Sequence, residues 1–355
     1  MNRFAAGFVR RVTGVANRPR RDSGVTRGVY SYPAKFQAHL PAELIRQCSR
    51  PGELVLDPYV GGGTTGLEAW LEGRRFFGVD LNPLALLLAR VKTTPVDPAA
   101  ARAAAATVVA SPVHREVLDE DDRQCLGAVI ASEVGRIAAA GDGMEPPIRD
   151  LIRLALLHSV KMAGRRDFDA PSIIPLFRRR VERILAGLAA LPEGGHPPVF
   201  RRGSCAAMPE IPDGAARLVV TSPPYKDLDV EYGLLQIQRP GRSKRSRLIW
   251  ALLGEPPLSK TDLCGGRGGA YWERLVPALR EIRRALATGA PAFFWTGFKT
   301  TADRDRFVAE LAAAGLPAAH LVPASLSDDR VASSRSTHHG RATGMLSRDY
   351  LIMCS

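Results

Sequence analysis

Two short buried strands, each ending in an acid and each followed by a helix, constrain the fold of this chain most. The strand at 53–57 ends at Asp57, and the strand at 76–80 ends at Asp80. A glycine-rich loop and a helix follow the first strand, and a helix with Asn82 as N-cap follows the second. Successive strand–loop–helix units of this length imply parallel strands joined by crossovers. The sequence therefore predicts an α/β protein with a doubly wound, mostly parallel sheet.

Further periodic segments extend this sheet. Strand patterns recur at 197–200, 218–221, 291–296 and 350–354, and helix patterns at 41–48, 227–232, 271–287 and 303–314. The stretch from 98 to 191 is different, because alanine-rich segments of helical period dominate it, at 101–110, 125–140, 147–163 and 176–190. We therefore expect a helical insertion in the α/β unit.

The charge of the chain favours a polyanionic partner. The 355 residues carry a formal net charge of +13, and ten of the first 50 residues are basic against two acids. A second acid-free run is expected to contact phosphates through Arg239, Arg242, Lys244, Arg245 and Arg247. The cluster Arg178-Arg179-Arg180 with Arg183 could also face phosphate, although a solvated helix face is the plainer interpretation.

The loop after Asp57 predicts a ligand that is not a phosphate. It reads Pro58-Tyr59-Val60-Gly61-Gly62-Gly63-Thr64-Thr65, which is not the G-x-G-x-x-G pattern, and no basic residue lies between Asp57 and Arg74. An acid before the loop suits a positively charged ligand, and Asp80 can hold ribose hydroxyls. S-adenosylmethionine, with its sulfonium and amino groups, fits both features. Taken singly, each acid could be an ordinary turn residue.

A second motif ends the strand at 218–221. Ser222-Pro223-Pro224-Tyr225 cannot continue a sheet, because neither proline has an N–H and each fixes φ near −65°. The Ser222 hydroxyl and the Pro223 carbonyl could accept hydrogen bonds from an amino group, and Tyr225 could stack on a flipped base. In isolation the motif could be a plain strand-ending turn.

Together these motifs resemble the DNA amino-methyltransferases. Residues 57–65 resemble the donor-binding loop of that family, 80–83 its second-strand acid, and 221–225 its catalytic motif. Residues 32–36 resemble the segment that precedes the donor loop and closes over the donor. The resemblance covers about 30–95 and 198–298. It implies a Rossmann-like methyltransferase fold, S-adenosylmethionine as cofactor, and double-stranded DNA with a flipped base as substrate.

The resemblance also implies the site residues. The catalytic residues would be Ser222, Pro223, Pro224 and Tyr225, with no metal. The donor pocket would be lined by Phe36, Asp57, Tyr59, Gly61, Gly63, Thr64, Thr65, Asp80 and Asn82. This chain departs from the family pattern in having Tyr59 for phenylalanine, an additional glycine at 62, and Ser204 or Cys205 where an adenine-contacting acid is expected.

The residue before the two prolines bears on the target base. A leading serine goes mostly with cytosine-N4 methylation in this family, so Ser222 favours that reaction. Methylation at the cytosine ring carbon is set aside, because none of the five cysteines follows a proline. Adenine-N6 methylation of DNA, base methylation of RNA and a catalytically inactive nucleic-acid binder remain alternatives.

These features divide the chain into regions. We expect a basic, irregular arm at 1–30, a catalytic domain at 31–97 and 192–355, a helical insertion at 98–191, and a target-recognition segment at 230–268. The composition suggests a bacterial gene and a cytoplasmic, nucleoid-associated protein, since no apolar run is long enough to span a membrane. The resemblance further admits a cognate restriction endonuclease as partner.

Overall fold

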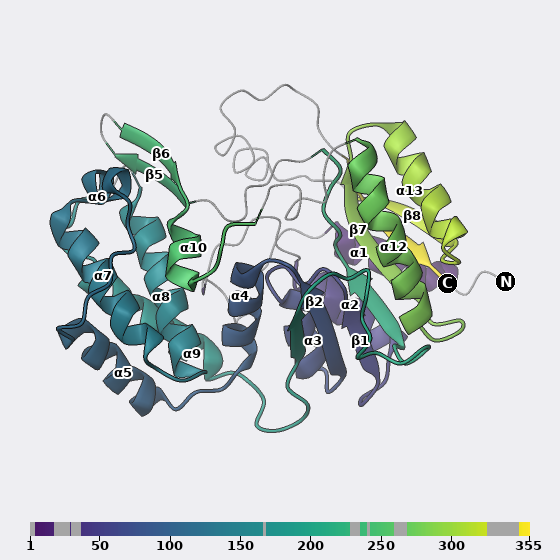
Figure 1. Cartoon of the computed structure of the whole chain (residues 1–355). Coiled ribbons are helices and arrows are strands. Elements are labelled where there is room, and N and C mark those ends of the chain that lie inside the picture. The colour runs from purple at the N-terminus through teal and green to yellow at the C-terminus, as the bar shows by residue number, and fades with distance from the viewer. Residues whose placement is uncertain are drawn as a thin grey trace.

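The structure is a computed structural model with two lobes (Figure 1). It describes residues 4–17, 29, 37–165, 168–227, 235–239, 242–258, 268–324 and 348–355. The backbone, without the side chains, is described at 235–236, 238–239, 242–245, 324 and 348. The segment 31–36, the helix predicted after Asp227 and most of the glycine-rich stretch at 264–269 lie outside the described residues.

A seven-stranded sheet forms the core of one lobe. Its order is β3 (Val199–Arg202), β2 (Arg75–Asp80), β1 (Leu54–Asp57), β4 (Leu218–Thr221), β7 (Ala292–Phe298), β9 (Arg348–Cys354) and β8 (Ala318–Ala324). Only β9 among these strands runs antiparallel to its neighbours. The chain winds outward from β1 to β3 and then returns to place β4 on the other side of β1. The predicted doubly wound, mostly parallel sheet is confirmed.

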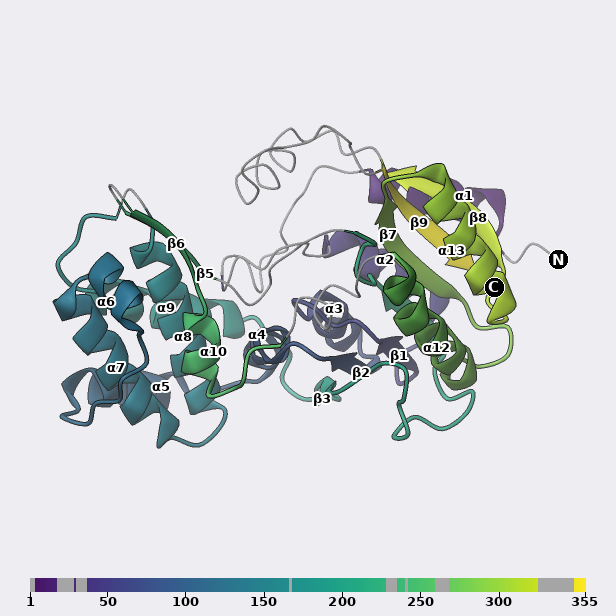
Figure 2. The same ribbon diagram turned by 45° about the horizontal axis from the view of Figure 1, so that its top comes forward.

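Helices cover both faces of this sheet (Figure 2). Alternate strand residues point to opposite faces. One face packs against α1 (Ala6–Ala16), α2 (His39–Cys48) and α3 (Thr64–Leu71), and its buried strand residues include Val55, Val220 and Phe293. The other packs against α12 (Gly269–Ala285) and α13 (Thr301–Ala313), and its strand residues include Leu56, Val219 and Phe294.

The expectation of an irregular arm at 1–30 is wrong for α1. This segment is an amphipathic helix whose Val12, Val15 and Ala16 are buried in the core above the sheet. Arg10 and Arg11 lie on its exposed side. The arginines make this segment strongly basic, but the apolar residues between them recur at helical spacing and form the face that packs on the sheet.

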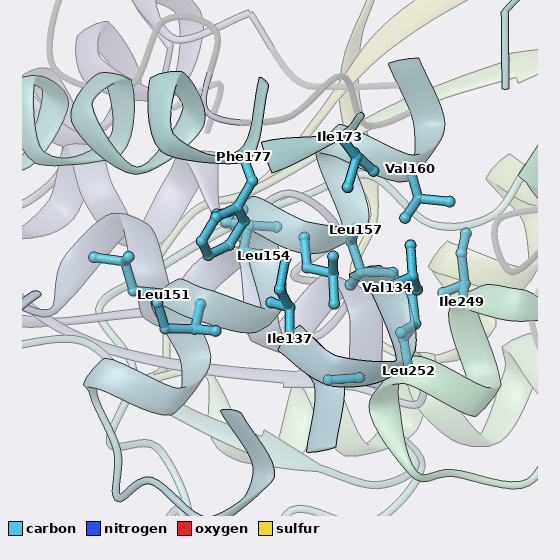
Figure 3. Packing of buried hydrophobic residues seen from close by; sticks show 14 of the residues in the cluster. Val134, Ile137, Leu151, Leu154, Leu157, Val160, Ile173, Phe177, Ile249 and Leu252 are labelled. Carbon is cyan, nitrogen blue, oxygen red and sulfur yellow. The ribbon is translucent and has the colours of Figure 1, made fainter. Parts of the chain in front are cut away.

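The predicted helical insertion consists of helices. They are α5 (Pro98–Ala110), α6 (Glu120–Leu126), α7 (Ala128–Asp142), α8 (Ile148–Ala163) and α9 (Ile174–Leu188). Figure 3 shows their shared core, in which Leu154, Leu157 and Phe177 are buried. The described helices include none that is long and apolar enough to cross a membrane.

Three segments from elsewhere in the chain complete the helical lobe. One face of α4 (Pro83–Thr93) lies in its core through residues such as Leu84 and Leu88. The hairpin β5 (Leu235–Arg239)–β6 (Arg242–Ser246) contributes Ile237, and α10 (Leu248–Leu253) contributes Ile249 and Leu252. The hairpin, α10 and β8 were not predicted, because the hairpin strands and α10 are short and all of these segments carry weak or mixed periodicity.

The docking of α1 is testable. Val12→Ala should lower the free energy of unfolding by about 2 kcal/mol, because it removes two buried methyl groups and leaves a cavity. Arg11→Ala, on the exposed side of the same helix, should change it by less than about 0.5 kcal/mol. Urea denaturation measures both. Equal effects would mean that α1 does not pack on the sheet.

Candidate active site

The two sequence motifs meet where β1 lies beside β4. The Thr221 hydroxyl donates a 2.7 Å hydrogen bond to Asp57 Oδ1 across 164 residues of sequence, and both side chains are buried. The strands are parallel, so their carboxyl ends share one edge of the sheet. Ligands of doubly wound sheets bind at this kind of point, where the winding direction reverses.

The backbone of the loop after Asp57 is committed to the chain itself. The amide of Tyr59 donates to Asp57 Oδ1 at 3.1 Å, and that of Gly61 to Asp80 Oδ2 at 2.8 Å. The amides of Val60 and Gly63 donate to the carbonyls of Val79 and Val60. A phosphate-binding loop instead points its N–H groups at the ligand. This loop is therefore not a phosphate cradle, as its sequence predicts.

Gly63 is required by its conformation and by its surroundings. Its φ of 72° is left-handed, and a Cβ there would lie 2.6 Å from the Ala89 Cβ of α4. Any larger residue would therefore push the start of α3 away from α4. Gly63 keeps the loop close to α4.

Two carboxyl groups flank the loop, and burial raises the pKa of each. The pKa of Asp57 rises to about 7, although hydrogen bonds from Thr221 and the Tyr59 amide oppose the shift. The pKa of Asp80 rises to about 6 for the same reason, opposed by the amides of Asn82 and Gly61. A positively charged ligand beside Asp57 would favour its ionised form.

Asn82 has the predicted capping role. Its side chain accepts a 3.0 Å hydrogen bond from the Leu84 amide at the start of α4, and its own amide donates to Asp80 at 2.8 Å. Asn82 thus orients Asp80 and begins α4 at the same point. Its side chain is buried.

The chain after β3 closes the other side of the loop. The Cys205 and Tyr59 side chains are hydrogen-bonded, and burial raises the pKa of the Cys205 thiol to about 11. Ser204 instead accepts from the Ala206 amide in a local turn. Of the two residues considered for the position of the missing acid, Cys205 contacts the donor loop.

The Ser222–Tyr225 corner is held at its far end. The buried Tyr271 hydroxyl of α12 donates to the Pro224 carbonyl at 3.0 Å. The Tyr225 ring lies close to Gly297 of β7, where an added Cβ would be 2.8 Å from Tyr225 Cε2. Ser222 is partly exposed, and its hydroxyl has no hydrogen bond to the described part of the chain. The corner is stiff and keeps one hydroxyl available.

Two supporting residues were missed from the sequence. Lys92 is buried and donates a 2.7 Å hydrogen bond to the Gly62 carbonyl, and Tyr271 holds Pro224. The only sequence signal for Lys92 is its place in an otherwise apolar helix, Pro83–Thr93. Tyr271 carries none, because its partner is a backbone atom 47 residues away.

Other predicted site residues are only partly placed. Thr64 and Thr65 begin α3 and are buried. Phe36 lies outside the described residues. Arg247 is exposed just before α10, while Arg239, Arg242, Lys244 and Arg245 lie on the hairpin with side chains outside the description. That hairpin packs on the helical lobe.

The comparisons with known proteins concern the donor side of the site. Residues 11–90 match the family model of the DNA methylases. This region is similar to that family. The predicted resemblance to the DNA amino-methyltransferases is thus confirmed over α2, β1, the donor loop, β2 and most of α4. The match ends before the helical insertion and before Ser222.

The similar proteins bear the names of methyltransferases. Type II methyltransferase M.Cfr9I of Citrobacter freundii is 46% identical over 50 residues, 13% of this chain and 17% of its own length. M.PvuII of Proteus hauseri is 39% identical over 56 residues, 16% and 17% of the two chains. DNA adenine methyltransferase YhdJ of Escherichia coli is 38% identical over 52 residues, 15% and 18%. This chain spans less than a fifth of each relative.

One solved structure resembles this chain at a much lower sequence identity. The TehB-like SAM-dependent methyltransferase of Corynebacterium glutamicum is 11% identical, with a TM-score of 0.33 over 89% of this chain and 86% of its own. A TM-score of this size carries no conclusion about this chain.

The raised pKa of Asp57 predicts a pH-dependent stability difference. Between about pH 4 and pH 7 the folded chain holds a proton on Asp57 that the unfolded chain releases, so raising the pH destabilises the fold. Asp57→Asn lacks this proton and keeps an acceptor for Thr221. As the pH rises through this range, the free energy of unfolding of Asp57→Asn should therefore increase by roughly 2–4 kcal/mol relative to that of the wild type. Denaturation at several pH values measures it, and a constant difference would contradict burial of the carboxyl group.

Proposed function

We propose that this protein transfers a methyl group from S-adenosylmethionine to an exocyclic amino group of a base in DNA. The observation that carries the proposal is the hydrogen bond between Thr221 and Asp57. It joins the DNA methylase region to the Ser-Pro-Pro-Tyr corner at one edge of the sheet. A donor held by the loop and a base held at the corner would therefore lie side by side.

The residues around the loop fit this donor. Asp57 and Asp80 are poorly solvated carboxyl groups, which suit a ligand with a cationic end and ribose hydroxyls. The amides of Tyr59, Val60, Gly61 and Gly63 already bond within the chain, so they are not directed at a phosphate of the ligand. When bound, S-adenosylmethionine supplies an electrophilic methyl group on its sulfonium. The residues proposed to hold it are Phe36, Asp57, Tyr59, Gly61, Gly63, Thr64, Thr65 and Asp80, with Asn82 orienting Asp80.

The corner supplies what a weak amine nucleophile needs. The amino nitrogen of a base is a poor nucleophile because its lone pair is delocalised into the ring. Hydrogen bonds from its N–H groups to Ser222 Oγ and the Pro223 carbonyl would hold it and draw density toward nitrogen. Tyr225, fixed against Gly297, would stack on the flipped base. With the donor bound, the methyl group would pass directly from its sulfonium to the amino nitrogen, leaving a thioether, and the amino proton would leave toward Ser222 or solvent.

We propose cytosine N4 as the target, because the residue before the two prolines is serine. The runner-up is adenine N6, since one of the similar relatives bears the name DNA adenine methyltransferase. An RNA base is a third candidate, and a non-catalytic nucleic-acid binder a fourth. The intact donor loop and the available Ser222 hydroxyl support catalysis over the last.

The helical lobe offers a surface for the DNA backbone. Burial, Arg183 and Arg179 together lower the pKa of Arg180, so these guanidinium groups lie close together on α9. Within the described residues, neither Arg180 nor Arg183 forms an ion pair with a carboxylate. Glu182 of the same helix pairs with Arg102 instead, and guanidinium groups that lack a carboxylate partner attract a polyanion. We propose that the insertion at 98–191 and the segment at 230–268 hold the DNA together. A cognate restriction endonuclease is a proposed partner.

Identification of the modified nucleoside tests the proposal. DNA incubated with the protein and S-adenosylmethionine is digested to nucleosides and examined by mass spectrometry, with Ser222→Ala as matched control. We expect N4-methylcytosine from the wild type and a rate lowered at least about 100-fold in the variant, with donor affinity nearly unchanged. Methyladenine alone would overturn the choice of base, and modified RNA with unmodified DNA would change the substrate class.

The role of the α9 arginines is tested separately. Replacing Arg180 and Arg183 together with alanine should weaken DNA binding about tenfold or more at low salt and reduce the slope of log K against log salt by about 1–2. Replacing the exposed Arg75 and Arg280, away from the site edge, removes the same charge as a control. Fluorescence anisotropy measures both. If both double variants weaken DNA binding equally, the α9 arginines contribute only through the net charge, and the proposed role of α9 is wrong.

A further inference from the structure

We propose that Lys92 is a positioning residue for the donor, because it holds the Gly62 carbonyl and with it the turn at 58–63. The inference deepens the proposed function and rests on it for the identity of the ligand. It assigns a role to a buried lysine that lies outside the sequence motifs.

Lys92 makes a defined contact from the last turn of α4. Its Nζ donates a 2.7 Å hydrogen bond to the Gly62 carbonyl, and only 1% of the residue is exposed. Gly62 is the additional glycine of this loop, so the contact lies where the loop departs from the family pattern. The neighbouring amides of Gly61 and Gly63 are bonded to Asp80 and Val60.

The position of Lys92 on α4 explains how it can set the loop. Ala89 lies three residues earlier on the same side of the helix and touches the site of Gly63, where an added Cβ would lie 2.6 Å away. The other side of α4, with Leu84, Leu88 and Val91, is buried in the core of the helical lobe. One helix therefore packs on the lobe and holds two consecutive glycines of the donor loop.

Burial of the Lys92 ammonium group is unfavourable in free energy, so a compensating interaction is expected. Removing such a charge from water costs several kcal/mol, whereas methionine would fill the same space without that cost. The bond to Gly62 offsets part of this cost and fixes the direction of the carbonyl next to Gly61, whose amide binds Asp80. A loop held in this way is already ordered before the ligand binds, which raises affinity by lowering the ordering cost.

The test compares Lys92→Met with wild type and with Lys161→Met. Lys161 is a partly buried lysine of α8 that makes the same chemical change possible in the helical lobe. For Lys92→Met, we expect the Kd for S-adenosylhomocysteine in calorimetry to rise about tenfold. Turnover at saturating donor should stay within about twofold, because Ser222 and Tyr225 are untouched. Lys161→Met should keep the wild-type Kd.

Hydrogen exchange gives a readout that does not depend on the ligand. In the donor-free protein, amides at 59–63 should exchange faster in Lys92→Met, while those of β1 and β4 remain as in wild type. Lys92→Gln, which keeps an N–H donor on a shorter stem, should be intermediate. Faster exchange throughout the chain would indicate general destabilisation and overturn the proposal.

The two proposals fail in different ways. Unchanged exchange at 59–63 together with unchanged Kd in Lys92→Met would overturn the role of Lys92 while the methyltransferase proposal stands. A wild-type protein that binds neither S-adenosylmethionine nor S-adenosylhomocysteine would overturn the proposed function. Faster exchange confined to the loop would still support the hold of Lys92 on Gly62 in that case.

Discussion

The hydrogen bond from Thr221 to Asp57 is the interaction on which the site depends. It joins the buried ends of β1 and β4. The parallel pairing of these two strands fixes their register. The donor loop begins directly after Asp57 and the Ser-Pro-Pro-Tyr corner directly after Thr221. A change in the register of β4 by one residue would turn Thr221 to the opposite face and separate the two motifs. The chemistry proposed for this edge therefore rests on a sheet contact.

A second dependence runs through α4. This helix is capped by Asn82, which also orients Asp80, and it supplies Ala89 and Lys92 to the donor loop. An adjacent face of α4 is part of the core of the helical lobe. The lobe and the donor loop thus share one rigid element. A nucleic acid bound by the lobe would therefore be connected to the donor loop through α4 itself.

The parts that the sequence predicted share a physical property. Asp57, Asp80, Asn82 and Gly63 lie at strand ends, a helix cap and a left-handed turn, which are local features, so local pattern suffices to find them even though Asp57 also binds the distant Thr221. The helix α1 was not predicted, because the arginines at 1–30 favour an irregular basic arm, although the apolar residues of the helix recur at helical spacing. Tyr271 and Lys92 were missed for another reason, since each binds a backbone carbonyl distant in sequence, and a carbonyl leaves no signature in the residue that bears it.

By itself the sequence determined the class of fold, the strand ends, the glycine-rich loop and the proline corner, because hydrophobic period, glycine and proline act locally. Only the tertiary structure decided which strand ends meet, and that the hairpin β5–β6 and α10 join the helical lobe. It also decided that Asp57 is buried enough for its pKa to reach about 7. Desolvation depends on every segment packed around a group, and no local stretch of sequence contains that information.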